Sequence, residues 1–274
     1  MKHDDHGVIR EQIQYSHEEG SEPVSLEVLV RGQGPLVVLI ASLGRGAEDF
    51  DDLGGRLAQA GYRTAAINPR GVGRSSGPPA RTLADYAADV AHVVRALSAD
   101  APAILVGHAF GNRVSRATAA FAPESVSGLI LLACGGQAPI PPHAAKALGD
   151  VFDEALSPED HIKAVETAFF APGNDPEVWR EGWFPAVAQA QQLALRASPQ
   201  AAWSGAGEVD IFIVQAVDDV IAPPANAEAL QSAYPDRVTV AMLPKAGHAM
   251  LPEQPDRIAE LVLQGLSRLV LRKP

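Results

Sequence analysis

Short apolar runs alternate with stretches of helical periodicity along most of the chain. The runs are expected to be strands buried on both faces, for which a parallel sheet is the economical arrangement. Between them, residues 50–57 and 83–97 place apolar side chains on one helical face, and another amphipathic helix is expected from about Glu253. The expected strands are residues 36–40, 64–67, 103–106, 129–132, 211–214 and 238–243.

This alternation predicts an α/β fold with a doubly wound, mostly parallel sheet. Residues 8–15 and 24–31 precede the first parallel strand and are expected to form an antiparallel edge pair, which brings the sheet to eight strands. In such folds the crossovers are right-handed and ligands bind beyond the C-terminal ends of the strands. We therefore expect the functional site in the turns that follow the strands.

Residues 137–207 interrupt the alternation. This segment is helical in pattern, lacks a convincing strand and holds all three tryptophans of the chain, Trp179, Trp183 and Trp203. We therefore expect a core domain formed by residues 1–136 and 208–274, with residues 137–207 inserted after the sixth strand as a helical cap.

The charge balance of the chain limits its partners. Its 274 residues carry 22 Lys plus Arg against 33 Asp plus Glu, for a formal net charge of -11 and a sequence pI near 5.1. Such a chain repels phosphate backbones and anionic lipids, which argues against nucleic acid or a membrane as a partner. Residues 1–6 show no signal-peptide core, no apolar run approaches the roughly 20 residues of a membrane span, and the single Cys134 cannot form an internal disulfide. A cytoplasmic location is expected.

The first chemical signal is a glycine-flanked turn, Gly107-His108-Ala109-Phe110-Gly111, between an expected strand and a helix. This is the setting of the nucleophile elbow G-x-S-x-G, in which two glycines allow a tight turn that lifts the central side chain above the sheet. Here the central residue is Ala109. By itself the pattern is weak, because glycines at this spacing also occur in ordinary strand–helix turns.

Two residues further along the chain strengthen the pattern. Asp219 follows the expected strand 211–214 and stands four residues before Pro223, and His248 lies in a glycine turn after strand 238–243. The order elbow, acid, histidine is that of a hydrolytic triad on an α/β sheet. Asp218 is the less favoured acid, because the spacing to the proline selects Asp219.

These motifs resemble the α/β-hydrolase superfamily over nearly the whole chain. The loop Asn68-Pro69-Arg70-Gly71-Val72-Gly73-Arg74-Ser75 is similar to the D-x-R-G-x-G-x-S loop of that family. A closer resemblance is to the aminoacrylate or carbamate hydrolases of the Rut pyrimidine-degradation pathway, whose elbow also has alanine in the nucleophile position. The segments that carry this closer resemblance are residues 107–111, 217–219 with Pro223, 247–249 and 263–266.

The resemblance implies an oxyanion hole made of backbone N–H groups. One belongs to Phe110, after the elbow centre, and the second to Leu43, in the loop after the first parallel strand. The family usually has His-Gly before the second donor, whereas this chain has Ala41-Ser42, which puts Ser42 near the site. The resemblance also implies that cap aromatics such as Trp179 and Trp183 contact substrate, although their spacing fits helix packing equally well.

Alanine at the elbow excludes the usual acyl-enzyme route, because a methyl group cannot be acylated. We expect a hydrolase in which Asp219 orients His248 and His248 activates water against a small enamine, carbamate or ester substrate. Two alternatives remain open. One is an engineered serine-to-alanine variant of a serine esterase or lactonase, and the other is a lyase or cofactor-free oxygenase on the same scaffold.

Other residues add no competing chemistry. Cys134 closes the strand 129–132 and precedes two glycines, where a small buried thiol is the expected role rather than a stand-in nucleophile. No metal-ligand spacing and no dinucleotide fingerprint appears in the sequence, so no metal and no cofactor is expected. The expected partner is a small-molecule substrate, and the oligomeric state, a homodimer included, is left open.

Overall fold

One eight-stranded sheet organises the computed structural model, which describes residues 7–16, 20, 22–98 and 101–271. The strand order is β1-β2-β4-β3-β5-β6-β7-β8, and this confirms the predicted doubly wound α/β fold. The strands are β1 (Ile9–Tyr15), β2 (Val24–Arg31), β3 (Leu36–Ile40), β4 (Arg63–Ile67), β5 (Ala103–His108), β6 (Val126–Leu132), β7 (Ile211–Ala216) and β8 (Val238–Leu243).

The sheet is parallel from β4 to β8, and the N-terminal pair runs antiparallel to its neighbours. β1 pairs with β2 and β2 with β4 in antiparallel register, as the edge-pair prediction requires. β3 and β5 lie side by side in the centre, with Leu39 opposite Val106. All five residues of β3 and all six of β5 are buried, because helices cover both faces of the sheet.

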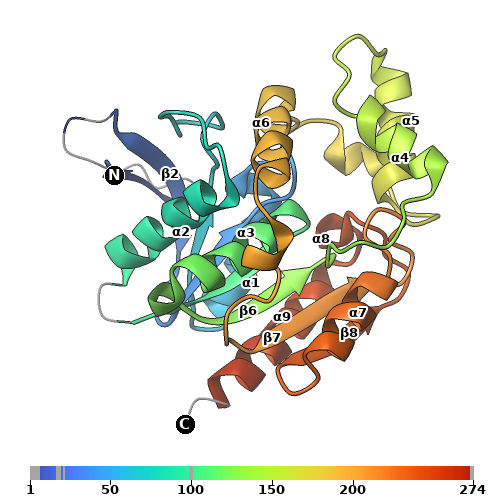
Figure 1. Ribbon diagram of the computed structural model, residues 1–274. Coiled ribbons are helices and arrows are strands. Elements are labelled where there is room, and N and C mark those ends of the chain that lie inside the picture. Colours follow the sequence, from blue (N-terminus) through green and yellow to red (C-terminus); the bar gives the residue numbers. More distant parts are fainter. Residues whose placement is uncertain (1–6, 17–19, 21, 99–100, 272–274) are drawn as a thin grey trace.

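Two layers of helices cover the two faces (Figure 1). α2 (Leu83–Leu97), α3 (Phe110–Phe121) and α7 (Ala225–Ala233) pack on one face, where Val38 and Leu105 join their core. α1 (Asp51–Gln59) and α9 (Pro255–Leu271) pack on the other, against Leu39 and Val106. Successive residues of a strand thus pack into opposite cores, because side chains alternate between the two faces of the sheet. Shorter helices are η1 (Ala47–Phe50), η2 (Pro123–Ser125) and α8 (Met250–Glu253).

The segment between β6 and β7 is helical, as expected, and none of its residues is in a strand. In the view of Figure 1, α6 lies above α3, and α4 and α5 form the upper right of the molecule. Phe169, Trp179 and Val165 join Ala147 in a small apolar cluster that also includes Ala249, from the loop after β8. The boundaries at residues 137 and 207 stay a prediction. The helices are α4 (Pro142–Asp150), α5 (Pro158–Phe169), η3 (Pro176–Trp179), α6 (Pro185–Arg196) and η4 (Gln200–Ala202).

Within the described segments, no helix combines the length and apolar character needed to cross a membrane.

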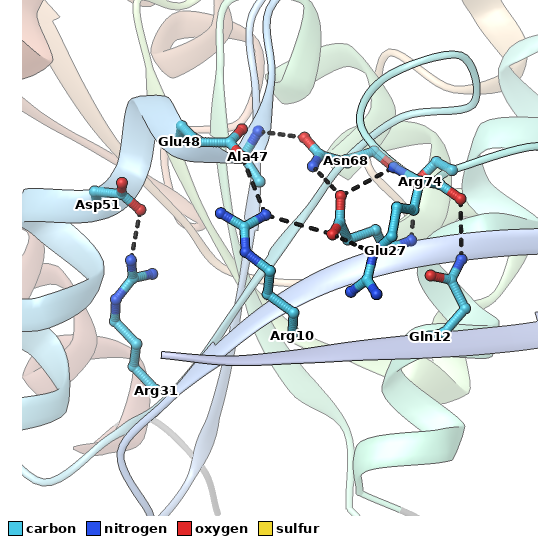
Figure 2. Close-up of polar contacts among 10 residues, drawn as sticks. Arg10, Gln12, Glu27, Arg31, Ala47, Glu48, Asp51, Asn68 and Arg74 are labelled. Atoms are coloured by element: carbon cyan, nitrogen blue, oxygen red, sulfur yellow. Dashed lines mark hydrogen bonds and ion pairs between the residues drawn. The ribbon is translucent and has the colours of Figure 1, made fainter. Parts of the chain in front are cut away.

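A buried carboxylate connects the loops that follow β3 and β4 in the chain (Figure 2). Glu27, on β2, is 2% exposed and accepts hydrogen bonds from Arg74 N–H at 3.0 Å, Arg74 Nε at 2.8 Å and Asn68 Nδ2 at 3.1 Å. The Asn68 side chain in turn accepts the N–H of Ala47 at 2.7 Å. Burial opposes ionisation, but the hydrogen bonds from Arg74 and Asn68 and the charge of Arg10 outweigh it and lower the pKa of Glu27.

Replacing this carboxylate should destabilise the fold in a pH-dependent way. Because the pKa of Glu27 is lowered on folding, its stabilisation is present above the ordinary glutamate pKa and is lost as the pH falls through the lower folded value. We expect Glu27→Gln to reduce the free energy of unfolding by about 2 kcal/mol at pH 7, since charged hydrogen bonds contribute about 1.5 to 3 kcal/mol. Urea unfolding at pH 7 and below pH 4 measures the effect.

The matched control is Glu11→Gln, on the neighbouring strand. Glu11 is partly exposed and contacts Arg63 at 3.4 Å, so its replacement should cost less than about 0.5 kcal/mol. A Glu27 effect that stays constant down to pH 3 would contradict the assigned role.

Candidate active site

The elbow is a strained turn between β5 and α3. Ala109 has φ 51° and ψ -104°, a conformation that an L-residue with a Cβ adopts only under constraint. Its N–H donates to the carbonyl of Leu132 at 3.0 Å, and its own carbonyl accepts the N–H of Asn112 at 3.2 Å. Phe110 begins α3, so its N–H is among the helix-end donors that have no intrahelical acceptor. The positive end of the helix dipole therefore points to the region above Ala109.

Two glycines make this turn sterically feasible. A Cβ on Gly107 would overlap the carbonyl of Gly111, and a Cβ on Gly111 would overlap the carbonyl of Ile40 at the end of β3. The backbone of α3 thus lies directly against the central strands. This contact explains why glycines flank Ala109 on both sides.

An acid and a histidine from two other strand ends meet beside the elbow. His248 Nδ1 lies 2.9 Å from Asp219 Oδ2 and 3.1 Å from Oδ1. Asp219 Oδ1 also accepts the N–H groups of Ile221 at 2.9 Å and Ala222 at 2.7 Å, which fix the carboxylate. Both side chains are at least 95% buried, whereas Asp218 is exposed. With Nδ1 directed at the carboxylate, Nε2 is the nitrogen of His248 left for substrate chemistry.

His108, the elbow residue before Ala109, supports the loop that carries His248. It is fully buried, and its Nε2 donates to the carbonyl of His248 at 2.8 Å. Burial, and then the neighbouring His248, lower the pKa of His108 to about 3, so this ring is neutral at physiological pH. His108 is therefore a brace for the backbone of His248, a role that its sequence position alone did not reveal.

The loop after β3 brings Ser42 and Leu43 to the same site. The N–H of Gly44 donates to Gln191 Oε1, on α6, at 2.8 Å, and both residues are buried. The N–H of Arg45 donates to the carbonyl of Ser42 at 3.2 Å. Gln191 thus anchors this loop from α6, a tie to a residue far along the chain that local patterns do not signal.

A second carboxylate fixes the loop that carries His248. Glu253 Oε2 accepts the N–H of Gly247 at 2.7 Å, while Oε1 accepts Ala171 N–H and Asn174 Nδ2, each at 2.7 Å. On the other side of His248, the N–H of Ala249 donates to the carbonyl of Phe169 at 2.8 Å. Burial raises the pKa of Glu253 although these donors oppose it. Residues 169–174, which begin with the last residue of α5, are therefore hydrogen-bonded to Ala249 directly and to Gly247 through Glu253.

The aromatic residues of the segment between β6 and β7 have unequal roles. The Phe169 ring lies 5.5 Å from that of His248 at an angle of 29° and stacks on Trp183. Trp179 and Trp183 hold the Arg45 guanidinium between them, 4.5 Å from each ring, and Arg45 also binds Asp49. Their rings are thus engaged with a buried cation, and neither tryptophan lines the cavity beside His248, where sequence reasoning expects them.

A cavity of about 250 Å³ joins these groups. Ser42, Leu43, Ala109, Phe110 and His248 all line it, so the structure brings together the expected elbow, base and oxyanion-hole residues. Most of the remaining wall is apolar and includes Phe152 and Phe169. The polar side chains of the wall, apart from Ser42 and His248, are Arg113, Gln192 and Asn226.

Cys134 does not face this cavity. It is fully buried at the end of β6, its N–H donates to Gln215 Oε1 at 3.2 Å, and burial raises the pKa of its thiol. A neutral, enclosed thiol is a poor nucleophile, which agrees with its expected packing role.

An elbow, an acid and a histidine that follow the C-terminal ends of β5, β7 and β8 are the arrangement of one class of hydrolytic enzymes on parallel sheets. The chain belongs to that class, the α/β hydrolase family, whose model matches residues 37–261. It is 32% identical over 248 residues to the putative carbamate hydrolase RutD of Variovorax paradoxus, which covers 83% of this chain and 90% of that protein.

The chain is also similar to a second hydrolase in sequence and to an esterase in structure. Over 110 residues, 40% of this chain and 39% of the relative, it is 36% identical to the 2-(acetamidomethylene)succinate hydrolase of Mesorhizobium japonicum. The fold matches that of a thermophilic esterase from Thermogutta terrifontis with a TM-score of 0.74 and 22% identity, over 95% of this chain and 99% of the esterase. Hydrolase-class relatives and the shared fold identify the chain as a hydrolase.

Removing the Gln191 acceptor should loosen the loop of Ser42 and Leu43. In Gln191→Leu the buried N–H of Gly44 has no acceptor, which costs about 1 to 3 kcal/mol of unfolding free energy. Urea unfolding measures the loss. Gln189→Leu, an exposed position on the same helix, is the control and should change stability by less than about 0.5 kcal/mol. Equal effects of the two substitutions would show that the Gly44 contact does not hold the loop.

Proposed function

We propose that this hydrolase cleaves a small carbamate, enamine or ester by direct attack of water, without an acyl-enzyme. The observation that carries the proposal is a buried His248–Asp219 pair beside a turn whose central side chain is a methyl group. Such a pair can remove a proton, but Ala109 cannot form an ester with substrate. The nucleophile must then come from solvent.

The mechanism follows from the positions of the donors and acceptors. Asp219 accepts the Nδ1–H of His248 and keeps the lone pair on Nε2, which takes a proton from water as its oxygen attacks the electrophilic carbon. Negative charge that develops on a carbonyl oxygen is stabilised by the N–H of Phe110 at the start of α3 and by the N–H of Leu43. His248 then returns the proton to the departing nitrogen or oxygen as the bond to carbon breaks.

The turn at Ala109 contributes to the proposed reaction even without a serine side chain. Its strained backbone directs the N–H of Phe110 and the helix dipole to the cavity, and both contributions are independent of the central side chain. The methyl group of Ala109 leaves space that a hydroxymethyl would fill. This space is suited to the attacking water.

The class of substrate is inferred from the cavity and from the relatives. About 250 Å³ with a largely apolar wall admits only a small molecule. The relatives are named a putative carbamate hydrolase and a 2-(acetamidomethylene)succinate hydrolase, and both named compounds contain bonds between carbon and nitrogen. The Rut-type hydrolases that the chain resembles also have alanine at the elbow. These likenesses favour an acyl–nitrogen or enamine bond over a simple ester.

Loss of the acid or the base should lower the turnover number. We expect His248→Gln and Asp219→Asn each to reduce kcat by about 10² to 10⁴-fold on 4-nitrophenyl carbamate, because general-base catalysis contributes factors of this size. His143→Gln, an exposed histidine on α4, should leave kcat unchanged. Turnover of 4-nitrophenyl acetate in H₂¹⁸O should place the label in acetate, whose oxygens do not exchange with water at neutral pH. Unlabelled product would instead indicate a lyase or oxygenase, and unchanged kcat in His248→Gln would reject the base.

Restoring a serine separates water attack from a disabled serine hydrolase. If Ala109 belongs to the water mechanism, Ala109→Ser should raise 4-nitrophenyl acetate hydrolysis by less than about tenfold, because the added hydroxymethyl would occupy the space proposed for the attacking water. A serine hydrolase that has lost its nucleophile loses on the order of 10⁶-fold in kcat. A gain of several orders of magnitude in Ala109→Ser would therefore overturn the proposal.

A further inference from the structure

One cationic side chain in the wall of the cavity has no anionic partner. Arg113, on α3, is partly buried and lines the cavity beside Ala109 and His248. Its guanidinium lies against the backbone of Gly135. No residue in the described part of the chain forms a hydrogen bond or an ion pair with its side chain, and burial and the charge of Arg116 lower its pKa. A partly desolvated guanidinium is costly unless a ligand balances its charge.

The neighbouring arginine shows the contrast. Arg116, one helical turn further along α3, donates to the carbonyl of Ser204, with Nε at 2.9 Å, and to that of Gly135 at 3.3 Å. Its guanidinium also lies over the ring of Trp203, 5.4 Å from the centroid. Arg116 is therefore engaged in structure, whereas Arg113 has no hydrogen-bond partner among the described residues and lines both this cavity and a second pocket beside Ser198 and Trp203.

A buried amide, that of Asn226, lies against Gly136, the residue that follows Gly135. Asn226, at the start of α7, is 6% exposed and lines the cavity. Its Oδ1 accepts the N–H of Ala138 at 2.8 Å, which assigns the amide orientation and leaves the Nδ2 donors without an acceptor among the described residues. A Cβ on Gly135 would crowd Arg113, and one on Gly136 would overlap Asn226. The absence of a side chain at Gly135 thus leaves room for the Arg113 guanidinium, and its absence at Gly136 leaves room for the Asn226 side chain.

The remaining wall offers nothing that would neutralise Arg113. Among the described residues that line the cavity there is no aspartate or glutamate, and Arg113 and His248 are its only titratable groups. The distance to the reacting centre is short, because Arg113 follows Ala109 by four residues, about 6 Å along the helix axis. The anion that fits is small, and its charge is only a few bonds from the bond that is cleaved.

We propose that Arg113 and Asn226 form a carboxylate subsite, so that the substrate is a small carboxylic acid whose cleavable bond lies near His248. This subsite rests on the proposed function, which identifies the bond near His248 as the one that is cleaved. A carboxylate accepts two parallel hydrogen bonds from a guanidinium and a further one from an amide, which matches the donors present. The subsite would orient the substrate and select acids over neutral analogues.

Binding of a matched pair of probes tests the subsite without requiring turnover. We expect 4-methylpentanoate to bind wild type at least tenfold more tightly than 4-methylpentanamide, as measured by isothermal titration calorimetry. Arg113→Met should remove this preference by weakening the acid alone, and Arg113→Lys should retain part of it. Asn226→Asp keeps the acceptor for Ala138 N–H but adds a competing negative charge, so it should weaken the acid at least tenfold.

The control is Arg95→Met, an exposed position on α2, which should bind both probes as wild type does. Melting temperatures within a few degrees of wild type establish that the variants are folded. Equal affinity of wild type for acid and amide, no measurable binding of the acid, or a preference that survives Arg113→Met would overturn the subsite. A preference that depends on Arg113 in a protein without carbamate turnover would leave the subsite standing and reject the proposed function instead.

Discussion

The contact between the backbone of α3 and the central strands determines the geometry of the whole site. Gly107 and Gly111 allow the helix to begin directly against the end of β3, and any side chain at either position would separate them. This contact sets three things together: the direction of the Phe110 N–H, the conformation of Ala109, and the position of Arg113 one turn further along the helix. The groups proposed to act on a substrate and the group proposed to hold it are therefore placed by one packing constraint.

The strained conformation of Ala109 has an energetic cost that the surrounding structure must offset. A non-glycine residue in such a region costs on the order of 1 to 3 kcal/mol. Burial on both sheet faces and the hydrogen bond from Ala109 N–H to Leu132 supply constraints of comparable size. A protein that needed only a strand–helix connection could use a relaxed turn. In the proposed mechanism the turn supplies its backbone donors, which do not depend on the central side chain.

Much of the fold could be predicted from the sequence because its signals are local. The strands at 36–40 and 238–243, the amphipathic α2, and the turns that hold Asp219 and His248 are all encoded within short windows. The expected burial of 238–243 on both faces was wrong, because β8 is the edge strand and only Val238 and Leu243 are buried. The supporting contacts are of another kind. Gln191 binds Gly44 across 147 positions of the chain, and His108 binds the carbonyl of His248 across 140, so no local pattern marks them. The tryptophans show the same limit, since only the fold reveals that Trp179 and Trp183 enclose Arg45.

The hydrogen bonds around Glu253 constrain how a substrate can reach the cavity. Residues 169–174 are tied to Gly247 and Ala249, on both sides of His248, through Glu253 and through the Phe169 carbonyl. If this stretch swung outward to admit a ligand, it would pull the catalytic histidine away from Asp219 or break these bonds. The stretch that carries Phe169 is therefore held on both sides of His248, and its contacts favour substrate entry past other parts of the cavity wall. In the proposed mechanism, His248 would then keep its alignment with Asp219 from one turnover to the next.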